Sequence, residues 1–294
     1  MSGLLQLTGH HKDLGGGFMV RRLLPAAQRQ AVGPFLFFDH FGPVTVEPGK
    51  NHDVRPHPHI GLATVTYLFE GAIMHRDSLG FEQRIEPGAV NWMTSGRGIV
   101  HSERGPKNLR NAAYVNHGLQ LWAALPQGSE EVEPAFFHTP AADIPVVTEG
   151  AAEVRVLVGE AFGKISPVKT FSKTIYLDVL LAGAGRLELP PLAEELALYV
   201  VDGEVSVDDQ SLASGTLAVL TPGLTTVLRC NAAARLVVIG GEPLDGHRYM
   251  WWNFVSSRKE RIVQASSDWL VQGMGQVPGE TEFISLPERR FTAS

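Results

Sequence analysis

The sequence predicts an all-β protein made of two tandem β-barrels followed by one C-terminal helix. Its 294 residues include 31 glycines and 19 prolines, and this composition favours many short strands joined by turns over long helices. A turn motif occurs once in each half of the chain with similar flanking spacing, which indicates two copies of one barrel. Helical periodicity is expected only near the C-terminus.

The internal repeat consists of an aromatic strand with an acidic turn, followed by a glycine and a second turn. The matching segments are 67–71 (YLFEG) and 199–203 (YVVDG), then Gly88 with 94–96 (TSG) and Gly215 with 221–223 (TPG). We therefore predict domains at residues 1–135 and 136–294. The proline-rich stretch 127–150 is interpreted as the connector, with Glu130 and Glu131 in a solvated turn.

The first half alternates apolar and polar residues with the period of β-strands. Antiparallel strands are expected near 60–69, 72–76, 82–86, 89–93, 99–104 and 117–125. On the last of these, His117, Leu119 and Leu121 share one face, while Gln120 and Trp122 share the other, and one of the two faces is expected to line the site.

The last part of the chain carries the signals of a single helix. Ser257 and Glu260 have the spacing of a capping box. Ile262, Ala265 and Trp269 follow at helical intervals, and Gly273 is a typical C-terminal stop.

Charge and composition exclude several classes of protein. The formal net charge of −6 argues against bulk electrostatic binding of nucleic acid. Cys230 is the only cysteine, which excludes an intramolecular disulfide and a thiolate metal cluster. No apolar run reaches membrane-spanning length, and the N-terminus lacks a secretory pattern. We therefore expect a cytoplasmic protein that binds neither membranes nor nucleic acid directly.

Two pairs of potential metal ligands lie within the stretch 55–103. His57 and His59 are separated by one residue, as are His101 and Glu103, so on strands each pair points to one face. Two such pairs on adjacent antiparallel strands converge on one point inside a barrel. Three imidazoles and one carboxylate suit a first-row transition metal, iron(II) above all, although manganese, cobalt, nickel or copper also fits. We predict one Fe²⁺ per chain.

Residues around these two pairs carry weaker signals. Pro56 and Pro58 stiffen the segment that carries the first pair. Asp39 and His117 are weaker candidates for residues that contact the metal ligands without binding the metal themselves. In the second copy, His57 and His59 align with Leu189 and Pro191, and His101 and Glu103 align with Leu228 and Cys230. The second barrel is therefore predicted to lack a metal site.

Several motifs together resemble the cupin superfamily and, more closely, the pirin family. They are 38–43 (FDHFGP), 55–61 (RPHPHIG), 67–71 (YLFEG), 96–103 (GRGIVHSE) and 252–257 (WNFVSS). Many cupins place a glutamate within a few residues of the HxH pair, but 60–64 contains no carboxylate. The glutamate falls instead at Glu103, as in pirins.

Four protein ligands would leave an octahedral ion about two open positions, for dioxygen and a substrate oxygen. That arrangement suits a dioxygenase acting on an enolate or catecholate, and Glu103 has a second task as acceptor of the substrate hydroxyl proton. Resemblance to pirins implies cleavage of a flavonol of the quercetin 2,3-dioxygenase type. It also implies an alternative, an iron-dependent redox sensor and transcription co-regulator that binds a protein partner. Isomerisation and metal storage remain further interpretations of the same ligands.

Overall fold

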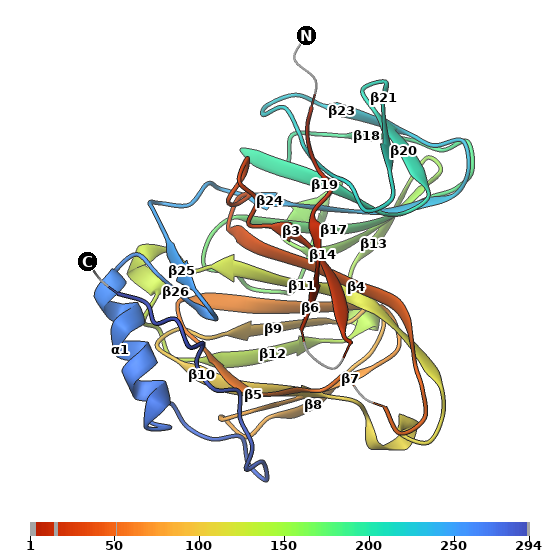
Figure 1. Cartoon of the computed structure of the whole chain (residues 1–294). Coiled ribbons are helices and arrows are strands. Elements are labelled where there is room, and N and C mark those ends of the chain that lie inside the picture. The colour runs from red at the N-terminus through yellow and green to blue at the C-terminus, as the bar shows by residue number, and fades with distance from the viewer. Residues whose placement is uncertain (1–3, 15–16, 51, 293–294) are drawn as a thin grey trace. The chain divides into compact units, whose positions relative to one another are not determined.

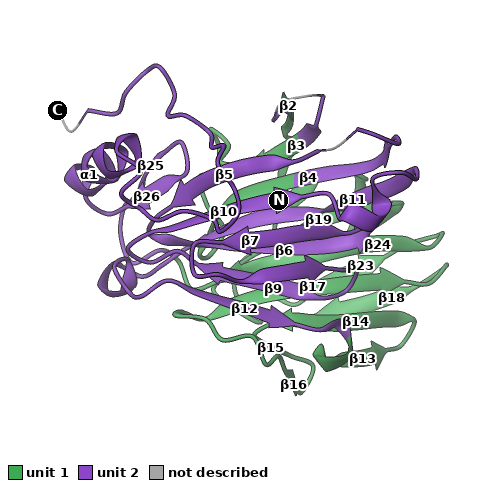
Figure 2. Cartoon of the chain, turned by 90° about the horizontal axis from the view of Figure 1, so that it is seen from below, with its two compact units in different colours: residues 1–12, 21–39, 142–243 green, residues 13–20, 40–141, 244–294 purple. Residues whose placement is uncertain are grey.

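The computed structural model describes residues 4–14, 17–50 and 52–292, which form two compact units of interleaved segments (Figure 2). Unit 1 comprises residues 1–12, 21–39 and 142–243, and unit 2 comprises residues 13–20, 40–141 and 244–294. The boundary predicted after residue 135 lies near the change of unit after residue 141. Residues 21–39, predicted in the first domain, belong to unit 1, and residues 244–294, predicted in the second, belong to unit 2, because joining a distant segment leaves no local signal in the sequence.

Unit 1 contains two antiparallel sheets and a short hairpin (Figure 1). The larger sheet has the order β1 (Leu5–Leu7), β22 (Leu217–Val219), β19 (Glu195–Asp202), β24 (Ala234–Gly241), β17 (Thr174–Leu181), β14 (Ala152–Val158), β13 (Val146–Glu149). The smaller sheet has the order β18 (Arg186–Leu189), β23 (Thr226–Arg229), β20 (Glu204–Val207), β21 (Gln210–Ala213), and the hairpin joins β15 (Glu160–Ala161) to β16 (Lys164–Ile165).

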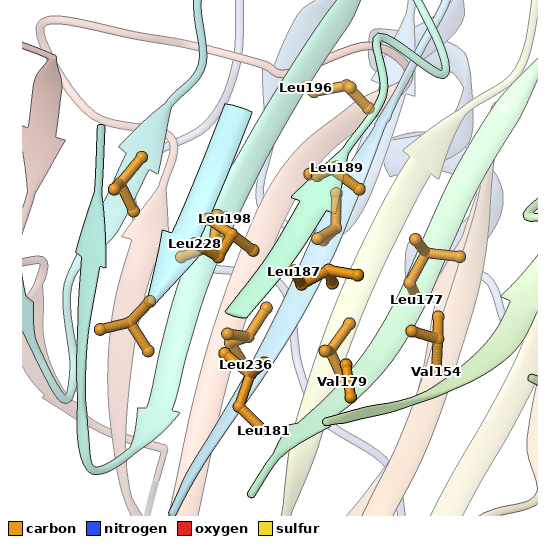
Figure 3. Close-up of a cluster of buried hydrophobic side chains, with 14 of the residues drawn as sticks. Val154, Leu177, Val179, Leu181, Leu187, Leu189, Leu196, Leu198, Leu228 and Leu236 are labelled. Atoms are coloured by element: carbon orange, nitrogen blue, oxygen red, sulfur yellow. The ribbon is translucent and has the colours of Figure 1, made fainter. Parts of the chain in front are cut away.

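Aliphatic side chains from both sheets fill the interior of unit 1 (Figure 3). Leu187 and Leu228 of the smaller sheet pack in the same buried cluster as Leu177, Val179 and Leu236 of the larger sheet. Alternation along each strand sends every second residue into this cluster. Burial of this many branched side chains is the main stabilising contribution to the unit.

Unit 2 repeats the two-sheet design. Its larger sheet contains, in order, β12 (Ala135–Thr139), β9 (Val90–Thr94), β6 (Leu62–Glu70), β11 (Tyr114–Ala124) and the second part of β4 (Phe35–Val46). Its smaller sheet has the order β5 (Val54–His59), β10 (Ile99–Arg104), β7 (Ile73–Asp77), β8 (Glu82–Ile85). Like β4, strands β2 (His10–Asp13) and β3 (Met19–Leu24) contain residues of both units. The predicted strands of the first half agree with β6 to β11 within a few residues at their ends.

The segment predicted as a connector contains two strands and two short 3₁₀ turns. Strand β12 extends the larger sheet of unit 2, and β13 extends that of unit 1. The turns are η2 (Gln127–Ser129) and η3 (Ala141–Asp143); a third, η1 (Lys107–Leu109), precedes β11. The change of unit after residue 141 lies within this segment. Pro134, Pro140 and Pro145 stand just outside the two strands, where they interrupt no ladder.

The C-terminal helix α1 (Lys259–Leu270) forms as predicted, with Ile262, Ala265 and Trp269 buried. It packs in one cluster with Ile60 and Val100, which neighbour the predicted ligands on β5 and β10 in sequence. The hairpin of β25 (Tyr249–Trp251) and β26 (Phe254–Ser256) joins this cluster, and Figure 1 shows it beside α1. The C-terminal segment therefore packs against residues next to the predicted ligands on β5 and β10.

The predicted capping box of α1 does not form. The cap residue is Arg258, without a side-chain hydrogen bond. The Ser257 backbone N–H and hydroxyl instead donate to the Glu130 carboxylate, as does the Ser256 hydroxyl. Glu130 is only 3% exposed and pairs with the buried Arg248, so its placement in a solvated turn was wrong. A buried carboxylate requires such partners, and these lie 118 to 127 residues away in the sequence.

Candidate metal centre

Three of the four predicted ligands converge inside unit 2. Strands β5 and β10 pair antiparallel with His57 opposite His101. One ligand atom from each of His57, His59 and His101 lies within 4.8 Å of the others. The ring centroids are 4.4 Å apart for His57 and His101, and 5.0 Å apart for each of the other two pairs. All three side chains are buried.

The local sequence explains how β5 delivers two histidines to one face. In the smaller sheet β5 is an edge strand that pairs only with β10. Proline is tolerated on an edge strand because its missing N–H interrupts no ladder there, so β5 accommodates Pro56 before His57 and Pro58 between His57 and His59. The Pro56 carbonyl accepts a hydrogen bond from the Ile284 N–H at 2.8 Å. The tail thus covers part of the free edge of β5.

Burial keeps the histidines neutral. Desolvation lowers the pKa of His57 to about 4, and it lowers the pKa values of His59 and His101 well below their ordinary value. Each neutral imidazole has one nitrogen with a lone pair that can bind a metal. Nδ1 of His57 is 2.8 Å from the Arg55 carbonyl; because a carbonyl only accepts, Nδ1 carries the proton and Nε2 is left to bind.

Two ring nitrogens of these three histidines are buried and have no hydrogen-bond partner among the residues that the structure describes. They are Nδ1 of His59 and Nε2 of His101. Leaving a buried polar atom unpaired is costly, and such atoms are uncommon in folded proteins. A divalent transition-metal ion accepts electron pairs from imidazoles, so the chemistry of this donor set and its orphaned nitrogens both fit the predicted metal.

Glu103 lies on the same strand as His101 but outside the group of three histidines. A register shift in the β5–β10 pairing between His101 and Glu103 places Glu103 opposite Val54. Desolvation raises the pKa of the Glu103 carboxyl to about 7, against the opposing effect of a hydrogen bond from the Thr66 hydroxyl at 3.5 Å. Glu103 is therefore a carboxyl group that gains or loses a proton near neutral pH.

A row of polar side chains crosses the larger sheet of unit 2 at the level of Thr66. The strand register places Asn91 of β9 and Gln120 of β11 on either side of Thr66. The Thr66 hydroxyl lies 2.8 Å from Gln120 Oε1, and Nδ1 of His138 on β12 lies 2.5 Å from Asn91 Oδ1. The contact between Thr66 and Glu103 joins this row to the ligand strand.

The face of β11 that lines the site is the one that carries Gln120 and Trp122. Gln120 contacts Thr66, and the Trp122 ring lies 5.2 Å from the His59 ring. The sequence left the choice between the two faces open, because both contain apolar residues. The contacts across the barrel decide it.

Sequence reasoning missed His75 and Asp77 on β7. The β7–β10 register places Asp77 opposite His101 and His75 opposite Glu103. Nδ1 of His75 lies 3.5 Å from Nδ1 of His101, and Nε2 of His75 lies 2.9 Å from Asp77 Oδ2. The signal that would have revealed them is the spacing of one residue between His75 and Asp77 on a predicted strand.

Asp39 and His117, the weaker candidates, make other contacts. Both oxygens of the Asp39 carboxylate accept hydrogen bonds from the Arg22 guanidinium, at 2.8 and 2.7 Å, within unit 1. Nε2 of His117 lies 2.8 Å from Nε2 of His40, and its ring packs on Phe69. We assign neither residue a role at the metal centre.

In unit 1, leucines occupy the positions that correspond to the ligands. Leu187 pairs with Leu228 across β18 and β23, as His57 pairs with His101 across β5 and β10. The counterparts of His57 and His59 are therefore Leu187 and Leu189, two residues before the positions given by the sequence alignment. That alignment counted from the acidic turn, and the loops between turn and strand differ in length.

In each unit, a smaller antiparallel sheet thus faces a larger one across the interior. Of the strand pairs β5–β10 and β18–β23, only β5–β10 in unit 2 carries histidines. This is the architecture of a protein with two cupin-type domains. The sequence matches the Pirin family over residues 17–123 and the Pirin C-terminal cupin domain over residues 176–275. The chain belongs to the pirin family.

Individual relatives agree with this assignment. A pirin-like protein of Caulobacter vibrioides is 45% identical over 97% of this chain and 99% of its own length. A crystal structure of quercetin 2,3-dioxygenase from Acinetobacter baumannii shares 34% identity, covers 99% of this chain and 96% of that one, and superimposes with a TM-score of 0.91. A second structure of that name and organism shares 29% identity, with a TM-score of 0.86 over 94% and 99% of the two chains. In the described parts of the chain, no helix is long and apolar enough to cross a membrane.

Proposed function

We propose that this protein is an iron-dependent dioxygenase of the quercetin 2,3-dioxygenase type, acting on a flavonol or a related enolate. The ligands would be His57, His59, His101 and Glu103, with one Fe²⁺ per chain and other divalent transition metals as substitutes. The observation that carries this proposal is the buried cluster of three neutral histidines, together with Glu103, which follows His101 by two residues on β10 and whose carboxyl pKa is raised to about 7. The similarity to the two Acinetobacter proteins supports the class of reaction.

The chemistry that bound iron would supply is the activation of an electron-rich substrate toward dioxygen. The residues of the chain would prepare the substrate for that reaction. The buried imidazoles are neutral at neutral pH, so they do not themselves balance the charge of an anionic substrate. That charge would be stabilised by the bound metal ion. The Trp122 ring beside His59 provides an aromatic surface at the site.

Glu103 would take the proton from a substrate hydroxyl. A base is most effective when its pKa lies near the working pH, and the pKa of Glu103 is raised to about 7. The Thr66 hydroxyl, shared between Glu103 and Gln120, would orient the carboxylate towards the donor. Asn91 and Gln120 supply further polar groups on the same row for the oxygens of a polyphenol.

The test is oxygen uptake by iron-reconstituted protein with quercetin, measured beside the loss of flavonol absorbance. We expect uptake in proportion to flavonol consumed, and its loss in Glu103→Ala. Glu103→Gln separates the two roles: retained iron with lost turnover would identify the carboxylate as the base. Glu153→Gln, on an exposed position of β14 in unit 1, is the matched control and should leave uptake unchanged.

Iron-loaded protein that consumes neither oxygen nor quercetin, nor related flavonols and catechols, would refute the proposal. An intact, redox-active iron centre without turnover would then favour the sensor interpretation, in which the metal alters the binding of a protein partner.

A further inference from the structure

We propose that Asp77, acting through His75, is a positioning residue that fixes the tautomer of His101 so that its Nε2 faces the metal. The inference rests on the metal site proposed above and adds two residues to it. It concerns which ring nitrogen carries the proton, and this decides which nitrogen is available as a ligand.

The relay begins at a carboxylate with one orientation. Asp77 is completely buried. Its Oδ1 accepts hydrogen bonds from the backbone N–H groups of Leu79 and Phe81, at 2.9 and 3.1 Å. Its Oδ2 lies 2.9 Å from Nε2 of His75. Since both oxygens only accept, the Nε2 of His75 must be the donor.

The proton on Nε2 determines the other nitrogen of His75. In a neutral imidazole with Nε2–H, Nδ1 has the lone pair and accepts. That Nδ1 lies 3.5 Å from Nδ1 of His101, a long contact between two buried side chains. With His75 as the acceptor, His101 carries its proton on Nδ1. Its Nε2 then presents a lone pair, and this nitrogen is the buried atom without a hydrogen-bond partner.

Packing holds the intermediate ring in place. The His75 ring stacks on Phe136 of β12, with centroids 4.2 Å apart and an interplanar angle of 9°. Rotation of the His75 ring about its Cβ–Cγ bond would move Nε2 away from Asp77. Because the ring and the Asp77 carboxylate are both held in place, the hydrogen bonds between His101, His75 and Asp77 have one donor–acceptor direction.

The second copy of the barrel supports a role linked to the metal. Val207 pairs with Leu228 across β20 and β23, as Asp77 pairs with His101. Val207 and Val205 therefore occupy the positions of Asp77 and His75. Both are buried in the aliphatic cluster of unit 1. The copy that lacks the histidine ligands also lacks the relay, whereas a residue needed only to shape the barrel would be needed in both copies.

Asp77→Asn tests the relay because the two backbone donors dictate how the new amide orients. Its oxygen should keep the N–H groups of Leu79 and Phe81, which turns its NH₂ group towards Nε2 of His75. That nitrogen must then accept, and His75 Nδ1–H would donate to His101. The proton of His101 moves to Nε2, where it blocks the metal. The same reasoning explains why an isosteric amide in place of the aspartate of a serine-protease triad leaves the wrong tautomer.

The measurement is the affinity of the protein for cobalt(II), obtained by competition with a chelator at pH 7. Outer partners of metal-bound histidines typically change metal affinity roughly 10- to 100-fold, and we expect a loss of that size in Asp77→Asn. The second measurement uses metal-free protein labelled with ¹⁵N-histidine. We expect the proton of His101 on Nδ1 in the wild type and on Nε2 in the variant.

His75→Phe separates the relay from a merely structural role for Asp77. Phenylalanine can stack on Phe136 but has no ring nitrogen. In the His75→Phe background, Asp77→Asn should cause no further loss of cobalt affinity. An equal loss in both backgrounds would show that Asp77 acts on the 77–81 turn alone and would overturn the proposal.

Two other outcomes have distinct meanings. Wild-type cobalt affinity or an unchanged His101 tautomer in a folded Asp77→Asn protein would also overturn the relay. Wild-type protein that binds no cobalt would instead refute the metal site, and the tautomer in metal-free protein would still decide whether the relay exists.

Discussion

In metal-free protein, His57→Gln and Glu103→Gln should change the pH dependence of stability in opposite directions. The pKa of His57 is lowered to about 4 by burial, and that of Glu103 is raised to about 7 by burial. Burial favours the unprotonated form of His57 but the protonated form of Glu103, although both residues belong to one site. Their effects on wild-type stability therefore partly cancel, and only the variants reveal them.

The sign for His57 follows from proton linkage. Between pH 6.5 and pH 4 the unfolded chain protonates this histidine while the folded chain keeps it neutral, so stability falls as the pH falls. Integrating between the folded value and an unperturbed value of about 6.5 gives a loss of about 2 kcal/mol from pH 7 to pH 5. His57→Gln removes this loss.

The sign for Glu103 is the reverse. Its folded carboxyl group binds a proton at a higher pH than the unfolded one, so burial of the charged form destabilises the protein as the pH rises from about 4.5 to 7. When the pH is lowered from 7 to 5, protonation of the buried Glu103 carboxylate stabilises the wild type by about 2 kcal/mol. Glu103→Gln removes the gain.

The assay is urea unfolding of chelator-treated protein at pH 7, 6 and 5, followed by circular dichroism. The informative quantity is the free energy of unfolding of the wild type minus that of each variant. On going from pH 7 to pH 5 this difference should decrease for His57→Gln and increase for Glu103→Gln. Glu153→Gln controls for the loss of one carboxylate. Differences that stay constant with pH for both variants would show that the buried site does not shift these pKa values.

Three further predictions address the ligands, the second barrel and the tail. His101→Ala should cut bound iron sharply while circular dichroism stays native, and full retention of iron would refute the ligand set; conversely, Leu228→His should bind no second metal, because Leu187 and Leu189 supply no companion ligands. Trp269→Ala, which empties a 2% exposed site in the cluster behind the ligand strands, should lower the free energy of unfolding by about 3–5 kcal/mol. A change below about 1 kcal/mol in urea unfolding would show that α1 contributes little to the stability of unit 2.

The sequence by itself determined the features that repeat over a few residues. Strand alternation placed His57 and His59 on one face, and the repeated acidic turn at Glu70 and Asp202 predicted two barrels. Helical spacing of Ile262, Ala265 and Trp269 predicted α1. These signals are readable because side-chain direction depends on position within one element, and an apolar face forces that element to bury it.

The tertiary structure decided the pairings between distant segments. The register that sets His57 opposite His101 spans 44 positions of the sequence, and it was predicted only through the assumption that their strands are neighbours. The one-residue spacing of His75 and Asp77 places both on one face of a strand, but only the pairing of β7 with β10 brings them next to His101. Ser257 had a local partner in Glu260 but bonds the buried Glu130 instead. A buried charge without partners costs more than a lost helix cap, so the long-range contact prevails over the local preference.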